Sequence, residues 1–471
     1  MNDIEYFTYL LEIPFVPLRY TPLAHWIRFP EYGHNPISWV LYSCVKYGLM
    51  CDSGCIRSLG LSTLLLYLQY LSFLEVLLLI FLFQLHLLAN DSVFPISIEQ
   101  RNRKLLRELI FFTYLTGVNV TTPSRGKNWL KLVHFSLIIS CCCGLYGQYC
   151  FVVKHFEESF TTYIECICTA FQCILPLTKL IYALLVQKRL HYFLETVQTG
   201  KIVQQLEIFD MGLSASLKIK LCDDITGILR DSWLIIRRQL VVYISSVVLI
   251  ASWYLLSALI INSYHQIIGS ANYTIQTLAI SFEGIFIVLT LHGMALLRIL
   301  HVIIRYSTHA SIEPHLRVTY LRKCIHHFER SYEYYEQINT LYKFICLPQF
   351  GISLFIMGMV LFQANVGLQT DMKMFIKMCL YIAAGGLAVF VYCYNGQKFT
   401  TESEMLNFSW YDCDWYQESN EFKQLIKMMI LRANRMMPMD VSGITTMTLM
   451  TFLAQTSGSY FLLLKNVQAG V

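Results

Sequence analysis

Polar side chains recur at helical spacing in the last hydrophobic segment of the chain, Thr445 to Leu464. They are Thr448, Thr451, Gln455 and Ser459, and steps of three and four place them in one stripe along an otherwise apolar helix. An amide such as that of Gln455 is costly to bury in hydrocarbon without a hydrogen-bond partner. We therefore expect the stripe to face protein or water rather than lipid.

Two kinds of chemistry fit this stripe. The same ridge continues to Leu463 and Val467, whose apolar side chains could form a constriction that controls an ion path by wetting and dewetting. Alternatively, the hydroxyls and the amide hold packed membrane helices together by hydrogen bonds. On the stripe alone, the second interpretation is the simpler one.

Other residues that could do chemistry give a weaker signal. His326 and His327 are neighbours, and Asp412 and Asp414 are two residues apart, and side chains at these spacings point away from one another on a helix. We interpret both pairs as solvated side chains rather than as a metal site or an acid–base pair. The sequence therefore predicts no enzyme, no metal and no cofactor.

The composition is that of a membrane protein that crosses the bilayer several times. Of the 471 residues, 55% are hydrophobic and only 14% are charged, and the mean hydropathy is +0.49. The formal net charge of +5 is spread along the chain, without the basic block that a nucleic-acid partner would need.

Seven apolar segments are each close to the roughly 20 residues that a helix needs to cross a bilayer. Lys and Arg gather before the first segment and in the second-to-third, fourth-to-fifth and sixth-to-seventh connections. By the positive-inside rule, the N-terminal side is cytoplasmic and the C-terminus extracellular, the reverse of a G-protein-coupled receptor. The fold class is thus all-α, and the segments are Trp129–Val153, Tyr163–Val186, Leu240–Ile261, Ile275–Leu297, Tyr342–Phe362, Met374–Tyr394 and Thr445–Leu464.

Two features flank this core. The third-to-fourth connection has no Lys or Arg and holds the sequon at Asn272, which this topology places outside, where it could be glycosylated. Residues 1–96 form an N-terminal extension whose hydrophobic stretch, Leu59 to Leu88, carries Glu75 near its middle. That stretch could be an anchor or an interfacial helix, or could lie outside the working protein.

The sixth-to-seventh connection contains an amphipathic helix. In Glu418 to Arg435, Phe422, Leu425, Ile426 and Met429 share one face at helical spacing. The following RMMPMDVSG should break the helix, so we expect the last helix in two parts. The apolar face could pack on another subunit, on the same chain or on the inner leaflet.

The C-terminal blocks YCYNGQKFTTESEMLNFSWYDCDWY and RMMPMDVSGITTMTLMTFLAQTSGSYFLLLKN resemble the signature of the insect odorant receptor family. The resemblance covers roughly Ser97 to Val471. The matching positions are Gly396, Ser403, Trp415, Pro438, Ser459, Tyr460 and Phe461.

The resemblance implies an odorant-gated, non-selective cation channel that assembles with a shared coreceptor in the plasma membrane of olfactory neuron dendrites. Residues 97–297 would hold transmembrane helices 1–4 with the odorant pocket, 298–443 the cytoplasmic anchor helices with transmembrane helices 5 and 6, and 444–471 the pore-lining last helix. It also implies that Gln455 and Ser459 face the pore, with Leu463 and Val467 as the gate. The pocket for small volatile odorants would comprise Tyr163, Ile167, Phe171, Trp253, Leu256, Ile260, Leu278, Phe282, Met378, Tyr381 and Ile382.

The alternatives differ in sequence detail. The fourth-to-fifth connection, Arg298 to Leu341, is shorter than the resemblance implies for a coreceptor, so a ligand-tuning subunit is expected. A gustatory-type receptor is the nearest competitor, but it would carry a TYxxxxxQF-like pattern where this chain has GSYFLLLKN. A G-protein-coupled receptor is opposed by the charge distribution of the loops.

Overall fold

The structure is a computed structural model that describes residues 128–154, 160–261, 273–370 and 372–456, together with positions 102, 106, 109, 110 and 113. Within these ranges the side chains of residues 248–281 are not described. The predictions made for residues 1–96, Asn272, Ser459, Leu463 and Val467 lie outside the described residues.

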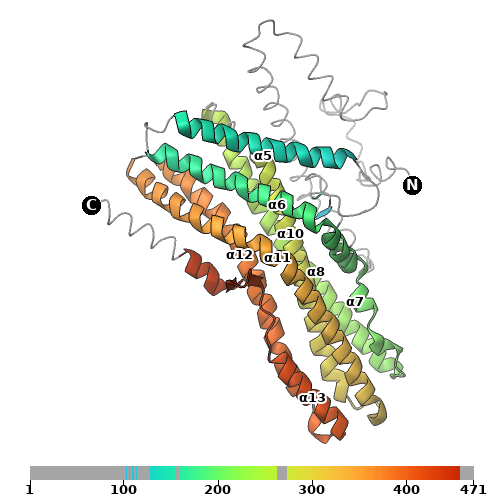
Figure 1. The fold of residues 1–471 in the computed structure, drawn as a ribbon. Helices are drawn as coiled ribbons and strands as arrows, with labels where there is room; N and C mark the ends of the chain where they lie inside the picture. Colours follow the sequence, from blue (N-terminus) through green and yellow to red (C-terminus); the bar gives the residue numbers. More distant parts are fainter. Residues whose placement is uncertain are drawn as a thin grey trace, which may run out of the picture. The chain divides into compact units, whose positions relative to one another are not determined.

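Long helices make up the described chain, and the first six predicted apolar segments each lie inside one of them (Figure 1). The helical prediction is therefore confirmed. The elements are α5 (Asn128–Lys154), α6 (Phe160–Thr199), α7 (Lys201–Gln204), η2 (Glu207–Asp210), α8 (Ala215–Ile261), α10 (Tyr273–Arg305), η3 (Tyr306–Thr308), α11 (Pro314–Thr370), α12 (Met372–Tyr411), η4 (Trp415–Gln417), α13 (Asn420–Ala433), β1 (Asp440–Val441) and β2 (Thr445–Thr446).

Helix α10 is the centre of the packing. It contacts α6, α8, α11 and α12, and from Phe282 to Leu297 its side chains are buried on every side. A helix that is apolar all round needs such cover. Four helical stretches of the described chain are long and apolar enough to cross a membrane, namely Cys166–Thr199, Phe282–Thr308, Pro314–Leu368 and Met374–Gln417.

The predicted amphipathic helix is present as α13. Its apolar face packs within the same chain, since Phe422, Ile426 and Met429 are buried and Leu425 is partly buried against the same core. Ser419 begins the helix, because its side chain accepts a hydrogen bond from the backbone N–H of Phe422. Of the three places considered for this face, the structure shows the same chain.

The break before the last helix is a short β-hairpin, in which β1 pairs with β2 in antiparallel register. Its turn needs Ser442 and Gly443 at positive φ, 54° and 76°. The last helix therefore starts at residue 449 and not at Thr445, which lies in β2.

Our prediction that the two histidines are solvated is wrong for His327 of α11, whose side chain is buried and only 3% exposed.

Candidate functional site

Apolar side chains of α6, α11 and α12 meet in a cluster separate from the main core, which we call the α6/α11/α12 cluster. An edge-to-face contact between Phe171 of α6 and Phe355 of α11 lies beside it, with ring centroids 4.8 Å apart. Its buried members are Ile164, Cys168, Ile356, Val360, Ala364 and Met378, and its partly buried members are Phe171, Ile352, Met359, Phe362, Met374, Phe375, Tyr381 and Ile382.

The structure brings together four of the eleven residues predicted to bind a ligand. Phe171, Met378, Tyr381 and Ile382 all belong to this cluster. Phe282 instead lies in the main core, between Tyr182 and Tyr342. Tyr163 and Ile167 are half-buried on α6, whereas for Trp253, Leu256, Ile260 and Leu278 the structure gives only a place in helices α8 and α10.

Helix α11 supplies more residues to the cluster than α6 or α12 does, and no α11 residue was among those predicted to bind a ligand. Among them are Ile352, Ile356, Val360 and Ala364. Steps of four residues place them in one row on the helix, and this spacing was the signal that could have identified them.

A buried ion pair joins α6 to α10. Lys179 Nζ contacts Glu283 Oε1, and the side chains are 2% and 0% exposed. Ionisable residues inside membrane spans are rare and pair with one another at functional positions. Both residues lie inside predicted apolar segments, so two charges within spans were visible in the sequence, although no role was predicted for them.

The last helix is attached to the rest of the chain at its first turns. Thr448 caps it, because the Thr448 Oγ1 accepts from the backbone N–H of Thr451, 3.2 Å away. The Gln455 amide donates to the backbone carbonyl of Phe350 in α11, 2.5 Å away, and Phe452 lies edge-on against Phe390 of α12. The described part of the polar stripe thus makes hydrogen bonds within this chain.

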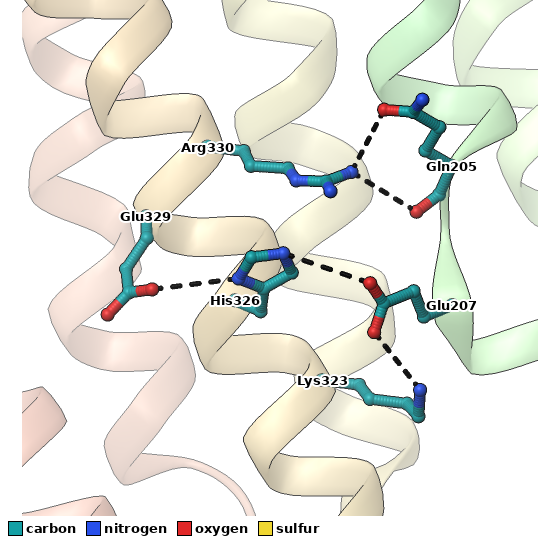
Figure 2. Close-up of polar contacts among 6 residues, drawn as sticks. All are labelled: Gln205, Glu207, Lys323, His326, Glu329 and Arg330. Carbon is teal, nitrogen blue, oxygen red and sulfur yellow. Dashed lines mark hydrogen bonds and ion pairs between the residues drawn. The ribbon is translucent and has the colours of Figure 1, made fainter.

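The connection between α6 and α8 is tied to α11 by the polar contacts that Figure 2 shows. Glu207 of η2 accepts a hydrogen bond from Lys323 Nζ at 3.1 Å and faces His326 at 3.8 Å, while Arg330 reaches Gln205. Lys323 lowers the pKa of Glu207 below its usual range by its hydrogen bond and its charge. These contacts hold the connection between α6 and α8 against α11.

A family model described as 7tm Odorant receptor matches residues 159–460, which is more than half of the chain. The chain belongs to the insect odorant receptor family. Odorant receptor 63a of Drosophila melanogaster is 31% identical over 410 residues, which cover 79% of this chain and 97% of that protein. Odorant receptor 67b of the same species is 26% identical over 402 residues, which cover 76% of this chain and 94% of that protein.

The fold agrees with this membership. This odorant receptor is similar to the structure of the insect olfactory receptor OR5 from Machilis hrabei in complex with eugenol, with a TM-score of 0.63 and 13% identity over 79% of this chain and 100% of that one. It is a multi-pass membrane protein of a receptor family, not of a family of enzymes.

Proposed function

We propose that this odorant receptor is a ligand-tuning subunit that binds volatile odorants and, together with the odorant coreceptor, gates a non-selective cation channel in the dendritic membrane of olfactory neurons. The observation that carries the proposal is the match to odorant receptors over 94% or more of two relatives' own length. The topology we propose has seven spans, a cytoplasmic N-terminus and an extracellular C-terminus.

For the odorant, we propose the region between α6, α8, α10 and α12 that contains the eleven residues predicted from the sequence, extended by the row of α11 residues. The α6/α11/α12 cluster supports this extension, because it combines aromatic, aliphatic and sulfur-containing side chains. Such a surface suits a ligand that offers few hydrogen bonds.

For the pore, we propose that the last helix lines the conduction path through Gln455 and Ser459 and closes it at Leu463 and Val467. The hydrogen bond from Gln455 to Phe350 supports a link between the two functions. Because Phe350 lies on α11 next to the cluster, a ligand that displaces α11 also moves the start of the last helix. An odorant opens the gate only if it binds the open arrangement more tightly than the closed one.

For assembly, we propose that exposed apolar side chains of α12 and α13 contact a second subunit. Met428 and Leu431 of α13 are 64% and 75% exposed, although the opposite face of α13 is buried in the chain. Phe408 of α12 is 69% exposed at the same end of the molecule. Apolar side chains that no part of the described chain covers favour a partner.

The experiment is whole-cell recording from cells that express this chain with and without an insect odorant coreceptor, under a broad panel of volatiles. We expect odour-evoked, non-selective cation current only in the paired cells. Current from this chain alone would contradict the tuning role. Responses to non-volatile tastants instead of volatiles would favour a gustatory-type receptor.

A further inference from the structure

We propose that Glu283 and Tyr392 form a polar subsite that binds the hydroxyl group of an alcohol odorant, with Lys179 holding the carboxylate in place. This inference rests on the proposed function, because it names the class of ligand for the same receptor. It concerns residues that neither the cluster nor the pore uses.

Residues from four other helices surround Glu283 of α10. Lys179 comes from α6 and pairs with one carboxylate oxygen, Oε1. The Glu283 carboxylate interacts electrostatically with three further side chains, which are Tyr243 of α8, Cys346 of α11 and Tyr392 of α12. A charged pair at such a junction is costly to bury, so the junction is a strong candidate for a binding role.

The second carboxylate oxygen has no partner. Glu283 Oε2 is buried and accepts no hydrogen bond in the part of the chain that the structure describes, and the same holds for the hydroxyl of Tyr392. Tyr392 packs beside this part of α10. The centroid of its ring is 4.7 Å from that of Phe286, which lies one turn from Glu283. An unsatisfied buried acceptor and an unsatisfied buried hydroxyl gain free energy from any group that pairs with both.

Two neighbouring phenols already donate to backbone carbonyls. Tyr342 donates to the carbonyl of Phe282 at 3.2 Å, and Tyr182 donates to the carbonyl of Leu341 at 2.6 Å. The buried Tyr392 hydroxyl, in contrast, has no partner among the described residues and is available to a ligand.

An alcohol fits these groups better than other volatiles do. Its O–H can donate to Glu283 Oε2, and its oxygen can accept from the Tyr392 hydroxyl. An ether of the same size only accepts, and a hydrocarbon does neither. A cationic amine would be repelled by Lys179, which already neutralises the carboxylate. Phe282, predicted as an odorant residue, precedes Glu283 in the chain, and its ring packs against Tyr182 and Tyr342.

The test compares two matched ligand sets, hexan-1-ol with methyl pentyl ether and heptane, and benzyl alcohol with anisole and ethylbenzene. Current is recorded from the receptor with its coreceptor, and the thermal stability of the purified complex is measured with each compound. We expect the alcohol of each set to act at the lowest concentration. Glu283→Gln should turn an amide N–H toward the ligand and weaken the response to alcohols about tenfold or more, with little effect on ethers.

Tyr392→Phe removes a single hydroxyl and should lower the alcohol-to-ether ratio in the same direction. Tyr342→Phe is the matched control, because its hydroxyl is already bonded to the backbone and its loss should leave the ratio unchanged. The double variant Lys179→Met with Glu283→Gln removes the unpaired lysine charge if Glu283→Gln alone does not fold.

Equal weakening of alcohols and ethers by Glu283→Gln and Tyr392→Phe would overturn the subsite and leave the ion pair a structural contact. No preference for alcohols in the unmodified complex, in current and in stability, would also overturn it. Selective stabilisation by alcohols without any current would keep the subsite and contradict the channel proposal instead.

Discussion

The amide of Gln455 donates a hydrogen bond to the backbone carbonyl of Phe350, 2.5 Å away and 105 residues earlier in the chain. This contact joins the start of the last helix to α11 at the edge of the α6/α11/α12 cluster. It also shows that a residue predicted to face a pore can be held by a neighbouring helix within its own subunit. The contribution of Gln455 to conduction and its contribution to gating can be separated by substitution.

Gln455→Leu keeps most of the side-chain volume but cannot donate to Phe350. We expect it to change the odorant concentration for half-maximal current, because the hydrogen bond between α11 and the last helix is lost. We expect ion selectivity to be unchanged. Gln455→Asp adds a negative charge, so if the side chain reaches the conduction path it should also increase calcium permeability relative to sodium. Identical selectivity in the two variants would contradict a pore-facing position for Gln455.

Gly396 allows α12 to approach the hairpin closely. A Cβ atom at this position would lie 2.5 Å from the carbonyl oxygen of Met447 and 2.6 Å from its Cβ, so one of the two segments would have to move. We expect Gly396→Ala to destabilise the protein by about 1–3 kcal/mol, the usual cost of overpacking. The measurement is the Tm of the purified receptor, together with the amount at the cell surface.

Gly386→Ala in the same helix is the matched control, since a Cβ there meets nothing within 4 Å. Replacing glycine by alanine in an open helical position should be neutral or slightly stabilising. Equal Tm values for the two variants would show that the hairpin does not pack against α12 in this way.

The helices were predictable because long apolar runs are the strongest signal that a membrane chain carries, and the break before the last helix was visible in its Pro and Gly residues. The pairing of Lys179 with Glu283 was not, because the two residues are 104 positions apart and only packing shows which helices are neighbours. The apolar row of α11 was visible in its spacing, but not that the row faces α6 and α12. His327 was misread because its helix is covered by α10, which the sequence does not show.

The contact of Glu207 with Lys323 should make part of the stability depend on pH. The pKa of Glu207 is below its ordinary value of 4.5 in the folded chain. A carboxylate of this kind stabilises the fold above its unfolded pKa, and the contribution is lost as the pH falls through the folded pKa. We expect Glu207→Gln to lower the Tm slightly at pH 7 and to have no effect below both pKa values. Asp231→Asn, whose ion pair with Arg230 is more than 60% exposed on both sides, is the control, and a difference that persists in acid would contradict the assignment.

The exposed face of α13 should bind a second subunit. Met428 and Leu431 lie three residues apart, so their side chains share one face, and the opposite face is already buried in the chain. Placing lysine at both positions leaves the buried face intact but puts two charges into the proposed interface, which would have to be desolvated there. We expect Met428→Lys with Leu431→Lys to reduce co-purification with the coreceptor tenfold or more at unchanged Tm of the isolated subunit. Full assembly of the double variant would place the interface elsewhere.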